Sequence, residues 1–283
     1  MPATLTASIG DIVNGNNCYN SISANNESNV THGTAKPITP PQSAEMRGFH
    51  RCLVEYDHKP YSITWNGVGS YPDLTKFPAP NDVVVSPVSQ SPEMAAIWRD
   101  SDLVDFGSFA SIRRTKNTGH DIFPILKLSH PDQQSIELIQ YEFNMLAYSS
   151  TLGLPVPEFD PHPVMNGTVT CGYRMKELFK MEASEFHSRS EDIKNALRRF
   201  HSAGICHGDI SRSNIMKDDR QNIVLIDCSF AGHIGSPTPP TIPTWVHLNG
   251  IFSAAKDWEA LENILSGSLN NLITSRLVVT APS

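Results

Sequence analysis

The sequence lacks the features that mark several classes of protein. None of its 283 residues belong to an apolar run long enough to cross a bilayer, and no basic-then-apolar signal peptide opens it. Lys and Arg number 22 against 29 Asp and Glu, and the net charge of −7 argues against a general nucleic-acid surface. We therefore expect a cytoplasmic or nuclear protein that binds neither membranes nor nucleic acid.

Cysteine is also sparse. The five cysteines are scattered, and an odd count without paired spacing indicates neither a disulfide framework nor a zinc site. Hydrophobic residues make up 39% of the chain and charged residues 18%, a composition typical of a globular core with polar loops.

The most informative stretch is His-Gly-Asp-Ile-Ser-Arg-Ser-Asn, which runs from His207 to Asn214. Asn214 follows Asp209 by five residues, and Asp227 follows Asn214 by thirteen, after an apolar run. Phosphoryl transfer needs one carboxylate to orient a hydroxyl, and an amide oxygen and a second carboxylate to hold Mg²⁺. A turn before a buried strand is the simpler interpretation, because Asn and Asp favour turns.

These residues resemble the catalytic loop and metal-binding segment of the protein-kinase-like superfamily. The His-Gly-Asp form is commoner in its small-molecule and atypical kinases. The resemblance implies that Asp209 is the catalytic base and that Asn214 and Asp227 are Mg²⁺ ligands. It also implies that Asp257 accepts hydrogen bonds from the catalytic-loop backbone.

The resemblance extends upstream to a glycine-containing loop and a lysine. The segment from Gly107 through Ser108 to Ile112 resembles a glycine-rich loop entering a strand, and Lys127 follows Ile112 by fifteen residues, the family's spacing. By resemblance, these four residues bind ATP, and Lys127 contacts its phosphates. A strand lysine that reaches out to water is the alternative.

A helical pattern begins at Pro131-Asp132 and carries Glu142. In the family, a helix glutamate in this context pairs with the strand lysine, so Glu142 is expected to hold Lys127. Glu137 is the rival candidate, and a solvated carboxylate is the alternative for either residue.

The segment 169–178 is expected to leave a strand and enter the connector between the lobes. By resemblance, Met175 would lie at the back of the adenine pocket, and Lys176 and Leu178 would present backbone groups to adenine. A buried strand followed by a loop is the alternative. The preceding Leu-Pro-Val-Pro is similar to aminoglycoside and choline phosphotransferase relatives. Further on, Ser188 and Glu191 form a capping-box pattern before a helix.

Four departures from the family pattern stand out. Asp105 replaces the first glycine of the loop, and Ala110 the third. Cys228-Ser229 replaces the Phe-Gly that usually follows the metal-binding Asp. Protein kinases carry a Lys at the position of Ser211, for which Arg212 could substitute. Finally, only about twenty residues follow the helix at 257–265, which leaves no room for the family's later helices.

We therefore expect an α+β, bilobal protein-kinase-like fold with a β-rich N-lobe at 96–178 and a reduced helical C-lobe at 179–283. Residues 1–45 are rich in Asn, Ser, Thr and Pro and are expected to be a disordered tail. Residues 46–95 are expected to form a small β-rich extension that covers the N-lobe, and the sequence assigns it no further role.

The expected function is ATP-dependent, Mg²⁺-dependent phosphoryl transfer to an unidentified hydroxyl acceptor, in the manner of a Ser/Thr protein kinase. A small-molecule kinase of the aminoglycoside or choline phosphotransferase type is one alternative. A pseudokinase that acts as a nucleotide-binding or scaffold module is the other.

Overall fold

A computed structural model describes residues 34–43, 48–66, 70–78, 82–116, 119 and 121–279, without the side chains of residue 248 and of 268–279. All of these residues belong to one compact unit, Gly33–Ser283. The expected tail lies outside the described residues as far as residue 33, whereas 34–43 contribute two short strands. None of the helices in the described part of the chain has both the length and the apolar character of a membrane span.

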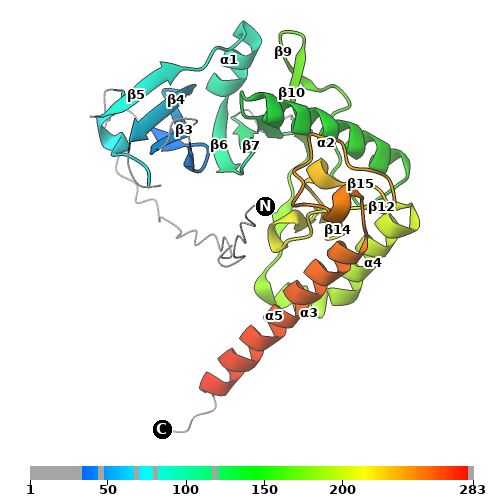
Figure 1. Cartoon of the computed structure of the whole chain (residues 1–283). Coiled ribbons are helices and arrows are strands. Elements are labelled where there is room, and N and C mark those ends of the chain that lie inside the picture. Colours follow the sequence, from blue (N-terminus) through cyan, green and yellow to red (C-terminus); the bar gives the residue numbers. More distant parts are fainter. Residues whose placement is uncertain are drawn as a thin grey trace, which may run out of the picture. The chain divides into compact units, whose positions relative to one another are not determined.

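The first sheet is antiparallel and pairs in the order β1-β3-β4-β5, with β2 also on β3 (Figure 1). Its five strands are β1 (Lys36–Pro37), β2 (Gln42–Ser43), β3 (Phe49–Tyr56), β4 (Lys59–Asn66) and β5 (Val83–Pro87). A short 3-10 helix, η1 (Leu74–Lys76), precedes β5. Alternating apolar residues such as Val54 and Ile63 fill one face of this sheet, as its period of two requires.

Helix α1 (Pro92–Arg99) connects the first sheet to the second. Ser91 caps it by accepting a hydrogen bond from the Met94 N–H, and Pro92 occupies the first turn, where no N–H is needed. The helix buries Met94 and Trp98.

The second sheet is antiparallel and has the order β6-β7-β8-β10-β9. Its strands are β6 (Ser101–Phe106), β7 (Ala110–Thr115), β8 (Ile125–Ser129), β9 (Val164–Asn166) and β10 (Val169–Met175). Helix α2 (Gln133–Thr151) packs on β8 and β10, and Asp132 caps it through the Ser135 N–H. The helix therefore begins where the sequence predicts it.

The two sheets share one apolar core. Ile38 and Leu53 from the first sheet pack with Leu126 and Leu128 of β8 and with residues of α1. The first sheet and α1 thus cover one face of the second sheet and exclude water from it.

The remaining chain is mainly helical, with short strands. The helices are α3 (Ala183–Ser188), α4 (Ser190–Ser202) and α5 (Ala255–Val279). The strands are β11 (Phe179–Lys180), β12 (Ile205–Cys206), β13 (Ile215–Lys217), β14 (Ile223–Leu225) and β15 (Gly232–His233). Three 3-10 turns, η2 (Arg212–Asn214), η3 (Cys228–Phe230) and η4 (Leu248–Gly250), complete this part. The sheet-rich N-terminal part and the helical remainder confirm the expected kinase-like α+β class.

The capping box predicted at Ser188 is wrong. Ser188 ends α3, where its hydroxyl donates to the Glu185 carbonyl and cannot cap α4. The capping box lies at the start of α3 instead, between Glu182 and Glu185.

Candidate active site

Lys127 lies at the centre of a buried charged cluster. It lies in the middle of β8, and its Nζ is 2.8 Å from Glu142 Oε1 on α2 and 3.0 Å from Asp227 Oδ1. The rival Glu137 accepts from Gln133 on the surface of α2 and lies outside the cluster. The structure thus pairs Lys127 with Glu142, the partner that the sequence favours.

Glu142 is held by two further donors. Its Oε1 accepts from the Tyr173 hydroxyl at 2.9 Å, and its Oε2 accepts from Ser229 Oγ at 2.8 Å. Burial raises the pKa of Glu142, although the Lys127 ammonium opposes this. Burial also works against the charge of Lys127, but Asp227 and Glu142 outweigh it and raise the Lys127 pKa. The ammonium therefore stays charged at neutral pH.

Asp227 follows β14 in a left-handed backbone conformation, with φ 65° and ψ 62°. Burial would raise its pKa, but the adjacent Lys127 ammonium and the Ser229 hydroxyl hold the pKa below its usual value. The Asp227 side chain is 37% exposed, whereas that of Glu142 is 2% exposed. The two carboxylates are therefore different: Glu142 is a sealed partner of Lys127, and Asp227 remains accessible to a ligand.

Asp209 and Asn214 form a second pair. The Asn214 Nδ2 donates to both the backbone oxygen and Oδ2 of Asp209, each at 2.9 Å. Because both amide hydrogens point to Asp209, the amide oxygen is directed away from it. Burial and the nearby charge of Asp227 raise the pKa of Asp209. The Ile226 N–H, next to Asp227, donates to the Asn214 carbonyl at 3.0 Å, so the Asp209–Asn214 pair adjoins the Lys127 cluster.

The loop that carries Asp209 is braced from α5. Asp257 is buried and accepts from the backbone N–H groups of His207 at 2.7 Å and Gly208 at 2.8 Å, as the resemblance predicts. Gly208 has φ +80°, and a Cβ there would lie 2.3 Å from the Phe230 carbonyl oxygen. Only glycine fits this close approach.

The glycine-containing loop forms the turn between β6 and β7. The Gly107 N–H donates to the Ala110 carbonyl at 2.8 Å, which closes the turn. The Ser108 carbonyl lies 3.1 Å from His130 Nδ1, and Ile112 pairs with Lys127 across the sheet. Asp105, which stands in place of the family's first glycine, is exposed. Its carboxylate lies 3.8 Å from the Lys180 ammonium, which balances its charge.

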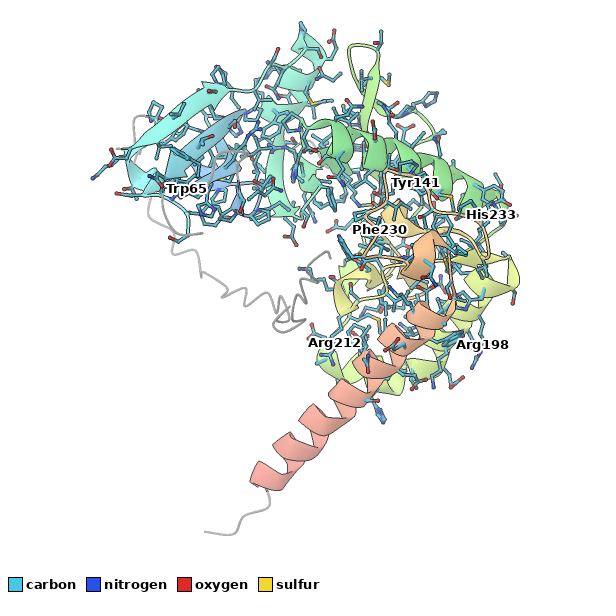
Figure 2. All side chains as sticks on the ribbon, in the orientation of Figure 1. Trp65, Tyr141, Arg198, Arg212, Phe230 and His233 are labelled. Atoms are coloured by element: carbon cyan, nitrogen blue, oxygen red, sulfur yellow. The ribbon has the colours of Figure 1, made fainter. Side chains whose placement is uncertain are left out.

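An aromatic contact links this turn to η3, the segment after Asp227. The rings of Phe109 and Phe230 meet edge to face at 6.3 Å, and Trp245 contacts the other side of Phe230 at 5.9 Å. Phe230 is labelled in Figure 2. The turn and the loop after Asp227 are therefore in contact.

The connector residues lie apart from the charged cluster. Met175 is buried at the end of β10, while Lys176 and Leu178 line a cavity of about 340 Å³. The described residues around this cavity include neither Lys127 nor Asp227. The Lys176 N–H donates to the Glu158 carbonyl. A ligand could therefore use the backbone carbonyl of Lys176 and not its N–H.

Arg212 contacts the helices that pack beside its loop. Its Nη2 donates to the Ile264 carbonyl on α5 at 3.2 Å, and its guanidinium lies 5.4 Å from the centre of the Phe186 ring on α3. Figure 2 shows Arg212 beside α5. The Ile264 carbonyl and the Phe186 ring thus hold Arg212, and its substitution for the lysine of protein kinases stays a prediction.

Sequence reasoning missed two residues of the cluster, Tyr173 and Ser229. Tyr173 pairs directly with Lys127 across β8 and β10, so the strand register could have found it. Ser229 carried a weaker signal, a hydroxyl at the position where the family has glycine.

Comparison with known proteins gives one family. The RIO domain model matches residues 104–238, which include the Lys127 cluster and the Asp209 loop. A search of curated proteins finds no match. The RIO domain is an atypical kinase-like family of ATP-binding phosphotransferases. Residues 104–238 are therefore similar to the RIO domain, and this match confirms the resemblance of the chain to the protein-kinase-like superfamily.

Proposed function

We propose that this protein transfers a phosphoryl group from ATP to a hydroxyl acceptor and requires Mg²⁺. One observation carries the proposal: the Lys127–Glu142–Asp227 cluster adjoins the hydrogen-bonded Asp209–Asn214 pair, since the Ile226 N–H, next to Asp227, donates to the Asn214 carbonyl at 3.0 Å. Phosphoryl transfer depends on positioning and charge stabilisation, and these side chains provide both.

The donor set fits magnesium. Mg²⁺ prefers oxygen ligands and is commonly held by one or two carboxylates together with substrate phosphates. The Asn214 amide oxygen and the accessible Asp227 carboxylate would hold it, and Mg²⁺ when bound neutralises phosphate charge.

Each remaining residue then has a chemical role. Lys127, kept charged by its two carboxylates, would bind the phosphates. Asp209 would orient the acceptor hydroxyl and take up its proton, and its raised pKa suits a base in a partly dehydrated site. Gly107, Ser108 and Ile112 would cover the phosphates, while Met175, Lys176 and Leu178 would contact adenine.

For the acceptor, we propose a protein serine or threonine. The His-Gly-Asp loop favours a small molecule as the second candidate. A nucleotide-binding module without turnover is the third candidate. It is favoured by Arg212, which is bound to the Ile264 carbonyl and would leave the transferring phosphoryl group without that cation.

The test has two stages. Mg²⁺ and ATP together should raise the melting temperature of the full chain, because a ligand that binds the folded state stabilises it. With an accepted substrate, Asp209→Asn should then lower turnover by roughly 10²–10⁴ while nucleotide binding persists. Asp102→Asn, which changes an exposed carboxylate on β6, is the matched control.

Two results would contradict the proposal. A melting temperature that does not respond to Mg²⁺ and ATP would exclude nucleotide binding. Full turnover by Asp209→Asn would exclude the role given to that carboxylate.

A further inference from the structure

We infer that Ser229 is a positioning residue that holds the Asp227 carboxylate against helix α2 and thereby sets the Mg²⁺ requirement of the site. The inference rests on the proposed function, in which Asp227 is a metal ligand. It gives a role to a residue that stands where the family has glycine.

The Ser229 hydroxyl bridges the two carboxylates of the cluster. Its Oγ lies 2.8 Å from Glu142 Oε2 and 2.8 Å from Asp227 Oδ1. Lys127 Nζ contacts the same two carboxylates, at 2.8 Å and 3.0 Å. The hydroxyl, the ammonium and the two carboxylates therefore form a closed ring of polar contacts.

The bridge joins distant parts of the chain. Asp227 is two residues from Ser229, whereas Glu142 on α2 is 87 residues away. The hydroxyl thus ties the metal-binding segment to the helix that fixes Lys127. Glycine at this position could not form either contact.

Ser229 cannot easily turn away from this position. Cys228 and Phe230, its neighbours in η3, are both buried, and Ser229 itself is buried. Cys228 packs with the helical core, and Phe230 packs with a separate cluster that includes Leu138 of α2. Two apolar anchors therefore direct the hydroxyl into the charged cluster.

Charge balance explains why the hydroxyl matters. Two carboxylates face a single ammonium, so one negative charge is not neutralised within the cluster. The hydroxyl can donate its one proton to either carboxylate, and both contacts favour the ionised form. Without it, Lys127 alone would restrain Asp227 Oδ1, and the carboxylate could rotate away from the metal position.

Ser229→Ala removes the hydroxyl with little change in volume. Loss of a group that orients a metal ligand typically weakens metal binding by roughly 10–100-fold. We expect the Mg²⁺ concentration that half-saturates ATP binding to rise by about tenfold, the lower end of this range, because Lys127 still holds Asp227. Ser229→Thr keeps a hydroxyl and should restore most of the Mg²⁺ response.

Ser149→Ala is the matched control. Ser149 is also a buried serine, on the same helix as Glu142, and its Oγ has no hydrogen-bond partner among the described residues. Its removal should leave the Mg²⁺ requirement unchanged.

The experiment measures ATP binding by the full chain over a range of Mg²⁺ concentrations, by calorimetry. A tenfold shift in Ser229→Ala alone supports the inference. Wild-type Mg²⁺ dependence in Ser229→Ala overturns it and leaves the proposed function standing. An equal shift in Ser149→Ala also overturns it, because the effect would then be a general one of core serines. If the wild-type chain binds no ATP at any Mg²⁺ concentration, the proposed function and this inference both fail.

Discussion

The buried ion pair between Arg113 and Glu55 gives a sharp test of how the first sheet is joined to the second. The Arg113 side chain is 0% exposed and donates to both Glu55 oxygens, at 2.7 and 3.1 Å. It also donates to Ser101 and to the Trp98 carbonyl, and its guanidinium stacks 4.1 Å from the Trp98 ring. Glu55→Gln would leave this cation buried without its counter-charge.

Removal of one partner of a buried pair typically costs about 3–5 kcal/mol. Because Arg113 keeps its contacts with Ser101 and Trp98, we expect a loss of about 3 kcal/mol in the free energy of unfolding, the lower end of that range. Urea denaturation followed by circular dichroism would measure it, with an unchanged slope showing that the same surface unfolds.

The next residue on β7 provides the control. Arg114 pairs with Glu177, but these side chains are 40% and 38% exposed. Pairs open to water contribute about 0–1 kcal/mol, so Glu177→Gln should have little effect. Similar losses below about 1 kcal/mol in both variants would refute the reasoning. Replacing Glu55 and Arg113 together by Met should recover much of the lost stability.

Three further predictions concern pH and backbone geometry. Burial lowers the pKa of His130 from 6.5 to about 4, so only the unfolded chain gains a proton between these values. The free energy of unfolding should therefore fall as pH drops from 7 to 5, and it should fall by about 2 kcal/mol more in the wild type than in His130→Gln. Urea denaturation at the two pH values measures both losses, and equal losses would contradict the prediction. Gly208→Ala should lower the free energy of unfolding by about 1–3 kcal/mol, because alanine would be strained at φ +80° and would collide with the Phe230 carbonyl. An unchanged melting temperature would exclude this clash. Finally, Asp209 must be ionised to act as a base, and its raised pKa should move the acid limb of the turnover–pH profile above the range of an ordinary aspartate; a limb near pH 4 would show that burial and Asp227 do not shift it.

The charged cluster was predictable because the kinase-like resemblance implies particular residue types at fixed spacings. Lys127 and Glu142 were identified from their spacing and their elements, and the structure joins them. Asp209 and Asn214 were predicted from a short local segment, in which five residues of separation already bring the side chains together. For each pair, a single short segment or a single family spacing was sufficient to predict which residues come together.

The contacts of Arg212 could not be predicted, because sequence does not determine the direction of a long exposed side chain. Its partners, the Ile264 carbonyl and the Phe186 ring, come from α5 and α3, and only the packing of these helices brings them to Arg212. The sequence also indicated that Cys228, directly after Asp227, replaces the phenylalanine of the family pattern. Phe230, one residue beyond the usual pair, fills a buried site against Leu138.

The first sheet was predicted as a β-rich extension that covers the N-lobe, but the contacts that join it to the second sheet were not predicted. Glu55 and Arg113 are 58 residues apart, and nothing in their local sequence connects them. Long-range ion pairs of this kind depend on the final topology, which periodicity alone does not give.

The shared core beneath β8 also affects how the protein should be truncated. The family match begins at residue 104, inside β6, whereas Ile38, Leu53 and Trp98 complete the apolar packing around Leu126. A fragment that begins at the family boundary would bare that leucine face to solvent and would leave Arg113 without its acid. A fragment that keeps this packing therefore has to begin before Lys36, well upstream of the family match.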